Sequence, residues 1–148
     1  MVPESLYDSD VLAWSVQQAN LLRRLGRGER VNDVDWDNIA EEIESLGRSE
    51  LHAVESYLDL IITHVLKIHA APEHESVIHW HNEIRTFQRN ARRRFTESMR
   101  KNINPASLYD EIVKPTQHTT PVPDANPFTL DDLLSAPVAQ LMEQLTRS

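Results

Sequence analysis

One stretch near the start of the chain carries charged side chains whose types and spacing could do chemistry. These residues are separated by four, three and four positions, which on a helix places them in one stripe: Asp37, Glu41, Glu44 and Arg48. We call this set the acidic stripe. Three interpretations of it remain open from the sequence. It could be a solvated surface with a Glu44–Arg48 ion pair, a surface that pairs with basic residues of this chain or of another subunit, or a carboxylate cluster that binds a metal ion.

A metal site would need histidine ligands in addition to these carboxylates. The chain has seven histidines, but His64 and His69 are five residues apart, as are His74 and His79. That spacing corresponds to about 140° around a helix, whereas two ligands on one face need a spacing of three or four. Neither His-Glu-x-x-His nor Glu-x-x-His occurs. A metal could still be held by residues from several helices, for instance His64, Glu44 and one of His79 or His81. The corresponding functional hypothesis is a metal-dependent helical-bundle hydrolase with Glu41, Glu44 and His64 as candidate ligands.

His64 also has a simpler interpretation, because a lone histidine beside an apolar helical face is usually a hydrogen-bonded packing residue. The sequence lacks the residues required for nucleophilic catalysis or for binding phosphate in a glycine-rich loop. There is no cysteine, no Gly-x-Ser-x-Gly, and no glycine-rich phosphate loop among three glycines. We predict no cofactor, and whether the protein is an enzyme stays open.

The second chemical feature is a run of basic residues. Residues 85–101 contain seven arginines and lysines against one carboxylate, a local net charge of +6. The rest of the chain must then carry −14, since the whole chain carries −8. Five arginines lie opposite the apolar side of the expected helix: Arg85, Arg89, Arg92, Arg93 and Arg100. We call the first four of them the arginine face.

The arginine face has three possible partners. It could form salt bridges with the acidic helix, bind an acidic or mixed-charge protein partner including a second copy of this chain, or contact nucleic acid. Nucleic acid is disfavoured, because the surrounding negative charge repels a polyanion and no aromatic stacking platform accompanies the arginines. The leading hypothesis is a non-enzymatic protein-interaction module that uses Glu41, Glu44 and Arg48 together with the arginine face.

Three principal helices are expected to carry these groups. The first should begin at Asp8, with Tyr7 and Leu12 as a hydrophobic staple, and end near Gly26 or Gly28. The second should begin at Asp35 and continue to Pro72, because apolar residues recur at helical spacing over more than thirty positions. The third follows the stripe of Trp80, Ile84, Phe87, Ala91 and Phe95.

Two positions of the long second helix are unusual. Gly47 lies in its interior at a cost of about 1 kcal/mol relative to alanine, so we expect a bend or a close helix crossing there. Glu50 continues the apolar face and is costly to bury without a partner. Either Gly47 changes the helical phase and turns Glu50 outward, which we favour, or Glu50 has a buried arginine or histidine partner.

Beyond residue 104 the chain changes character. Prolines and threonines over residues 104–127 predict an extended strap around one short helix at 106–113. Residues 128–148 are expected to form a helical C-terminal tail, with one helix capped by Thr129 and another capped by Ser135 with Pro137 in its first turn. The predicted fold is an all-α bundle of three principal helices in a single domain, 1–148.

Several of these segments resemble the bacterial domain of unknown function family number 29. The resemblance covers nearly the whole chain and implies a mostly α-helical fold without an established activity, substrate or cofactor. The residues that carry it are LYDSD at 6–10, Trp14, QANLLR at 18–23, DWDNIAEEIESLGRSE at 35–50, His64, Lys67, Pro72, Ser76, Trp80, Ile84, Gln88 with Arg89, and NPFTLDDLL at 126–134.

Composition limits where the protein works. Apolar residues make up 40% and charged residues 26% of the 148 positions, as in a globular protein. The absence of cysteine suits a reducing compartment, and the acidic N-terminus lacks the pattern of a signal peptide. The most apolar run is interrupted by charged residues and histidines, so we expect no membrane span and a cytoplasmic location.

Overall fold

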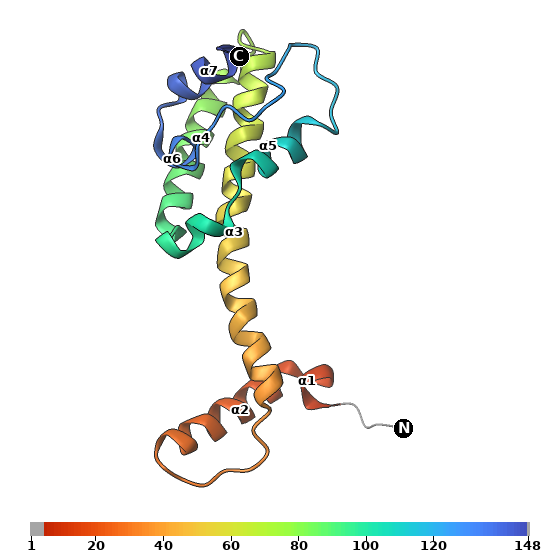
Figure 1. Ribbon diagram of the computed structural model, residues 1–148, viewed down its shortest axis with the longest axis vertical. Helices are drawn as coiled ribbons and strands as arrows, with labels where there is room; N and C mark the ends of the chain where they lie inside the picture. Colours follow the sequence, from red (N-terminus) through yellow and green to blue (C-terminus); the bar gives the residue numbers. More distant parts are fainter. Residues whose placement is uncertain (1–4, 148) are drawn as a thin grey trace. The chain divides into compact units, whose positions relative to one another are not determined.

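The computed structural model describes residues 5–147, and every regular element in that part of the chain is a helix, which confirms the all-α prediction (Figure 1). The very long second principal helix is also confirmed. Within the described residues, no helix is both long and apolar enough to pass through a membrane. The helices are α1 (Leu6–Ser9), α2 (Val11–Gly26), α3 (Trp36–Ala70), α4 (Val77–Arg94), the 3-10 helix η1 (Glu97–Asn102), α5 (Pro105–Val113), α6 (Leu130–Ser135) and α7 (Val138–Thr146).

These helices form two compact units. Unit 1 is Met1–Arg48, described from residue 5, and unit 2 is Ser49–Ser148, described to residue 147. Helix α3 contributes its first turns to unit 1 and the rest to unit 2. Whether both units unfold together as the single domain expected from the sequence stays a prediction.

The first helix expected from the sequence is divided in two: the short α1 begins before Asp8, and the long α2 begins after it. Ser5 caps the short helix α1, and Asp10 caps α2 by accepting a hydrogen bond from the Ala13 amide. Asp8 is therefore not the cap of the long helix. The expected contact of Tyr7 with Leu12 is also replaced, because the Tyr7 ring packs edge-on against Trp14 at 4.8 Å and its hydroxyl contacts Glu42.

Unit 1 is held together by polar contacts around one buried aromatic ring. The indole nitrogen of Trp14 donates to the Asp35 carboxylate at 3.0 Å. Gln18, which is also buried, accepts from the Asp35 amide and donates to the Asp33 carbonyl. These bonds fix the chain at the point where α3 begins, one residue after Asp35 as predicted.

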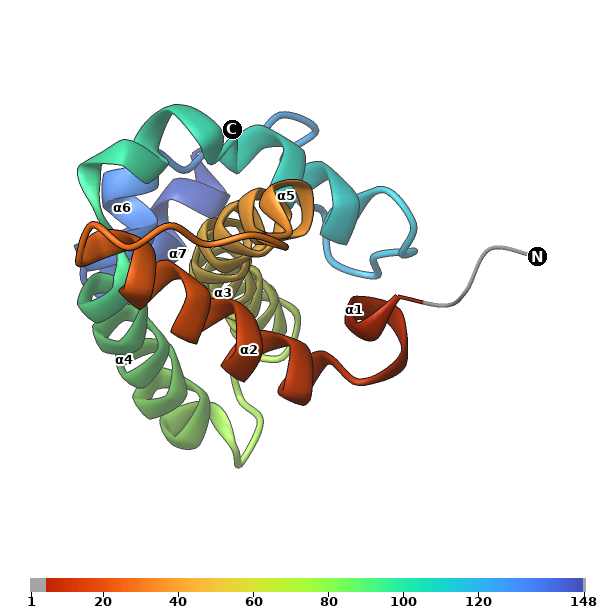
Figure 2. The same cartoon turned by 90° about the horizontal axis from the view of Figure 1, so that it is seen from below.

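Unit 2 contains the main hydrophobic core. Figures 1 and 2 show α4, α6 and α7 on one side of α3 and α5 on the other. The buried face of α3 has helical spacing, and the buried residues of the C-terminal helices complete the core. Its fully buried members include Val54, Leu58, Ile61, Ile62, Val65, Ile84, Tyr109, Leu133 and Leu141.

At the two unusual positions of α3, the structure shows no close helix crossing at Gly47 and a half-exposed Glu50. The helix continues through Gly47 without interruption, and a Cβ atom there would meet nothing within 4 Å, so no close helix crossing explains the glycine. Glu50 pairs with Arg94 at 3.7 Å while about half of its side chain stays exposed. The buried face of α3 begins only with Leu51 and Val54, so Glu50 is not forced into the core.

The C-terminal residues are part of the core rather than a tail. Thr129 caps α6 in a reciprocal capping box with Asp132, as predicted. Ser135 does not cap the next helix, because it is the last residue of α6, and Pro137 is the N-cap of α7 instead. Between α5 and α6 the chain is irregular, and Tyr109 ties it down by donating to the Pro123 carbonyl at 2.6 Å.

Candidate functional site

Three arginines of α4 line an open groove in unit 2. Arg85, Arg89 and Arg92 are separated by four and three residues, so all three project from one face of the helix. The groove has a volume of about 700 Å³. The connection from α6 to α7 forms the opposite wall. The residues that line the groove are His81, Asn82, Arg85, Thr86, Gln88, Arg89, Arg92, Ser135, Ala136, Pro137, Val138 and Ala139. We call it the arginine groove.

Two side chains of α4 fix the opposite wall of the groove. Gln88 is buried, and its amide donates to the carbonyls of Leu133 and Ala136 at 3.2 and 2.8 Å. Arg92 donates to the Leu134 carbonyl at 2.6 Å. The last carbonyls of a helix have no partner within the helix. Gln88 and Arg92 therefore satisfy the C-terminal end of α6 and hold it against α4.

The N-terminus of α7 opens onto the same groove. Its N-cap is Pro137, which provides no side-chain hydrogen bond. The first amides of a helix lack partners within the helix and carry the positive end of its dipole. Because Val138 and Ala139 line the groove, these amides add to the positive potential made by the arginines.

The arginine face is not neutralised by carboxylates of unit 2. Among the described residues of unit 2, no Asp or Glu oxygen lies within 4.0 Å of the guanidinium nitrogens of Arg85, Arg89, Arg92 or Arg93. Neighbouring arginines do have partners: Arg94 pairs with Glu50, and Arg100 pairs with Glu97 and Asp131. Salt bridging to the unit 2 part of α3 thus involves the end of α4 and leaves Arg85 and Arg89 without a polar partner among the described residues of unit 2, whereas Arg92 is bonded to the Leu134 carbonyl. Arg93 is exposed but does not line the groove.

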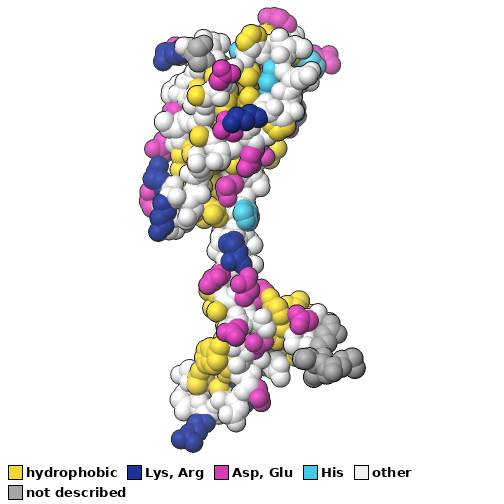
Figure 3. Space-filling model, turned by 45° about the vertical axis from the view of Figure 1, so that its right-hand side comes forward, with side chains coloured by type: hydrophobic (Ala, Val, Ile, Leu, Met, Phe, Trp, Pro, Cys, Tyr) yellow, Lys and Arg dark blue, Asp and Glu magenta, His cyan; other side chains and the backbone are white. Residues whose placement is uncertain are grey.

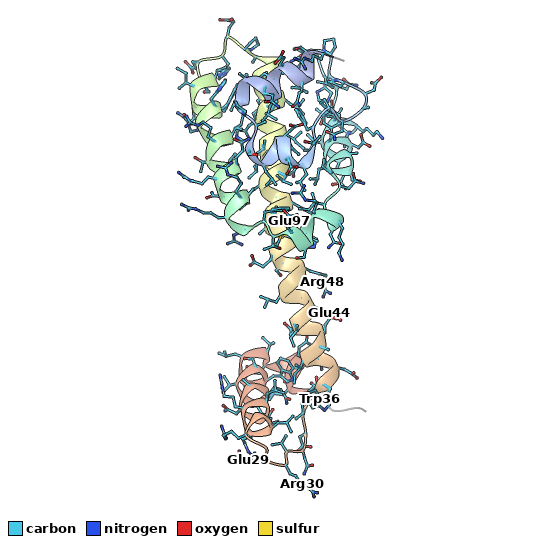
Figure 4. All side chains as sticks on the ribbon, turned by 60° about the vertical axis from the view of Figure 1, so that its left-hand side comes forward. Glu29, Arg30, Trp36, Glu44, Arg48 and Glu97 are labelled. Carbon is cyan, nitrogen blue, oxygen red and sulfur yellow. The ribbon has the colours of Figure 1, made fainter. Side chains whose placement is uncertain are left out.

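The acidic stripe of unit 1 is an exposed local ion-pair network. Arg48 lies 2.6 Å from Glu41 and 3.7 Å from Glu44, and all three side chains are at least half exposed. Figure 4 shows Glu44 and Arg48 on neighbouring turns of α3. This geometry matches the interpretation of a solvated surface, in which such pairs contribute a few tenths of a kcal/mol.

His64 is a buried packing residue with two polar partners. Its Nδ1 lies 2.8 Å from the Leu60 carbonyl and its Nε2 lies 2.6 Å from Glu83 of α4. Glu83 also contacts the exposed His79 at 3.1 Å. The His64 ring packs edge-on against Phe87. This cluster joins α3 to α4 and lies outside the arginine groove.

The structure does not bring Glu41, Glu44 and His64 together. Both glutamates contact Arg48 in unit 1, whereas His64 contacts Glu83 in unit 2. Within residues 5–147, no group of three or more histidine, aspartate or glutamate side chains is arranged to hold a metal ion. The ligand set considered for a helical-bundle hydrolase is therefore not formed by these residues.

Sequence reasoning missed the roles of Gln88 and Gln18, although a signal was present. Each lies on the apolar stripe of its helix: Gln88 between Ile84 and Ala91, and Gln18 one turn after Trp14. A polar residue in an apolar stripe is expected to be buried with a hydrogen-bond partner. The identity of the partner is set by tertiary packing and could not be predicted.

Comparison with known proteins agrees with this fold. The family model described as "Domain of unknown function DUF29" matches residues 6–137, so the chain belongs to this family. An alpha-helical protein of unknown function from Rhodospirillum rubrum, solved as a crystal structure, is 28% identical with a TM-score of 0.65. The match covers 94% of this chain and 99% of that one. Among curated proteins there is no match. None of these comparisons indicates a specific function.

Proposed function

We propose that the protein is a non-enzymatic interaction module that holds an acidic segment of a partner protein in the arginine groove. The observation that carries this proposal is the set of three arginines lining one groove with no carboxylate partner among the described residues of unit 2. Arginine binds carboxylates through two parallel hydrogen bonds, which gives both affinity and orientation.

The spacing of the groove arginines supports an extended acidic segment. Arg85 and Arg89 are four residues apart on α4, a rise of about 6 Å along the helix axis. Alternate side chains of an extended strand are about 6.8 Å apart on the same face. Carboxylates at alternate positions of the partner can therefore meet successive arginines. The amides at the start of α7 provide a further positive group beside them.

The charges of unit 2 favour a short acidic segment over nucleic acid. Outside residues 85–101, unit 2 carries twelve aspartates and glutamates against three lysines and arginines, a net charge of −9. A long polyanion would be repelled by this surface once it extended beyond the groove. A segment of a few residues can bind within the groove without contacting the rest.

Fluorescence anisotropy with a labelled peptide of alternating glutamate and serine tests the proposal. The double substitution Arg85→Glu with Arg89→Glu should weaken binding at least about tenfold, because it replaces two attractive charge pairs with repulsive ones. Arg93→Glu is the matched control, since Arg93 is exposed on the same helix but outside the groove. Raising the salt concentration should weaken binding of the wild type.

Two results would contradict the proposal. One is an unchanged peptide affinity in the double variant, which would place the binding elsewhere. The other is tighter binding of a single-stranded DNA oligonucleotide than of the peptide, with the same dependence on Arg85 and Arg89. That result would make nucleic acid the ligand of the groove. Circular dichroism of each variant controls for loss of helical structure.

The proposal includes a cytoplasmic location. It is supported by the absence of cysteine from all 148 residues, which suits a reducing compartment. Cell fractionation with an antibody against the protein would check this part separately, and recovery in an oxidising compartment would contradict it.

A further inference from the structure

Arg92 is a positive charge that is held in place in the arginine groove. Its guanidinium donates to the Leu134 carbonyl at 2.6 Å, and because a carbonyl is neutral, this contact orders the group without cancelling its charge. Among the described residues of unit 2, no carboxylate oxygen lies within 4.0 Å of it. A guanidinium that is already ordered loses less side-chain entropy when it binds an anion. Arg92 is therefore the pre-positioned part of the groove.

Arg89 lies close enough to Arg92 to bind the same anion. The two residues are three apart on α4, a rise of about 4.5 Å, and side chains at this spacing are neighbours on the helix surface. Arg89 is exposed and has no ion pair among the described residues of unit 2. Like charges at this spacing repel each other. An anion that contacts both guanidinium groups would remove this repulsion.

A phosphate group fits this pair of arginines better than a carboxylate does. A carboxylate has two oxygens, and one guanidinium fork binds both of them. A phosphorylated serine or threonine carries about −1.5 to −2 charges near neutral pH and three acceptor oxygens, so it can accept from two guanidinium groups and neutralise both. Arg85 lies one turn away, four residues before Arg89, and is left to hold a carboxylate.

We propose that the segment held in the arginine groove carries a phosphorylated serine or threonine, with the phosphate between Arg89 and Arg92 and a carboxylate of the same segment at Arg85. This arrangement rests on the proposed function, since it specifies the chemistry of the segment that the groove holds. Phosphorylation of the partner protein would then increase its binding.

The charges of unit 2 favour a protein segment over a membrane that displays phosphate headgroups. Figure 3 shows aspartate and glutamate side chains at several places on the face of unit 2 that it presents. Outside residues 85–101, the net charge of unit 2 is −9. An extended anionic surface would be repelled by these carboxylates, whereas a short segment contacts the groove alone.

Fluorescence anisotropy of the full chain with four labelled peptides tests the inference. The peptides alternate glutamate and serine and differ only at the centre. The centre is glutamate, serine, phosphoserine, or two neighbouring glutamates that match the charge of the phosphate. The phosphoserine peptide should bind at least about tenfold more tightly than the glutamate peptide. It should also bind about threefold or more tightly than the charge-matched peptide, because geometry contributes in addition to charge.

A lysine substitution separates geometry from charge. Arg89→Lys keeps the positive charge but removes the planar fork, so the phosphoserine and glutamate peptides should then bind within about threefold of each other. The affinity of the glutamate peptide itself should change by less than about threefold. Arg93→Lys is the matched control, since Arg93 is exposed on the same helix but outside the groove, and it should preserve the preference for phosphoserine. Circular dichroism checks that both variants keep their helical structure.

Equal affinities of the phosphoserine and glutamate peptides would overturn the phosphate inference and leave binding of an acidic segment in place. A preference for phosphoserine that survives Arg89→Lys would overturn the assignment to this pair of arginines. Failure of all four peptides to bind would contradict the proposed function and this inference together.

Two further results would overturn the choice of a protein segment. One is displacement of the phosphoserine peptide by inorganic phosphate at concentrations close to the Kd of the peptide, which would make the free anion the ligand. The other is tighter binding of vesicles that contain phosphatidic acid than of the peptide, with the same dependence on Arg89.

Discussion

At the scale of single residues, the arginine groove depends on buried amide hydrogen bonds as well as on charge. Gln88 is 5% exposed and satisfies two carbonyls at the end of α6. Arg92 satisfies a third and also lines the groove. Arg85 and Arg89 have no such structural contact among the described residues, which is why they can be changed to test binding.

Gln88→Ala should lower the free energy of unfolding by about 3 kcal/mol, because it leaves two buried carbonyls without donors and creates a cavity. Urea denaturation followed by circular dichroism measures the change. Arg93→Ala, an exposed change on the same helix, should stay within about 0.5 kcal/mol of the wild type. Equal effects of the two substitutions would show that the Gln88 hydrogen bonds do not hold α6.

Asp35 makes the stability of unit 1 depend on pH. Hydrogen bonds from the side chains of Asn38 and Trp14 lower the pKa of the Asp35 carboxyl below its ordinary value. The folded state therefore binds this proton less readily than the unfolded state. The contribution of Asp35 to stability is full above the unfolded pKa of about 4 and is lost as the pH falls through the folded pKa.

Asp35→Asn should consequently lower the urea midpoint at neutral pH, and the difference from the wild type should shrink as the pH falls below the ordinary aspartate pKa of about 4. The measurement is urea denaturation of both proteins over a series of pH values from neutral to acidic. A difference that stays constant or grows on acidification would contradict the assignment of these hydrogen bonds to the charged carboxylate.

At the scale of elements, the sequence predicted the helices better than their ends. The apolar period over residues 36–70 predicted the long helix α3, and Thr129 predicted the start of α6. Ser135 was misassigned as a cap because a serine two residues before a proline fits both the end of one helix and the start of the next. Gln88 and Arg92 complete the end of α6 from another helix, which no local pattern encodes.

The two glycines Gly47 and Gly28 should respond in opposite ways to the same change. Gly47→Ala should raise the free energy of unfolding by about 1 kcal/mol, because the site is helical and a Cβ would meet no atom within 4 Å. Gly28→Ala should lower it by about 1 kcal/mol, because Gly28 has a φ of +84°. Thermal or urea denaturation measures both. A destabilised Gly47→Ala variant would contradict the open helical surroundings of this position.

At the scale of the whole molecule, the sequence showed that charge is unevenly distributed but not which charges pair. Pairing of the acidic stripe with the arginine face was one of three interpretations that the sequence left open. Within unit 1, Glu41 and Glu44 pair with Arg48 on their own helix. Among the described residues of unit 2, Arg94 with Glu50 is the one arginine–carboxylate pair between α4 and α3. Which partner each charge meets depends on which helices pack together, and helical periodicity alone does not contain that information.

The exposure of Ile43 and Leu46 in unit 1 was also not predicted from the sequence. Helical spacing predicted that Ile43 and Leu46 share a face with the buried residues of unit 2, and this would ordinarily indicate burial. The structure covers that face only from Leu51 onwards. Apolar periodicity thus predicts which residues share a face. Whether that face is buried depends on which other helices pack against it.

The most direct test of the proposed function is an NMR titration that observes the arginine Nε–Hε groups of the full chain. As the alternating glutamate and serine peptide is added, the signals of Arg85 and Arg89 should shift saturably, while the signal of Arg93 should stay in place. Uniform small shifts of all three arginines, or shifts confined to residues outside the groove, would contradict binding of an acidic segment at this site.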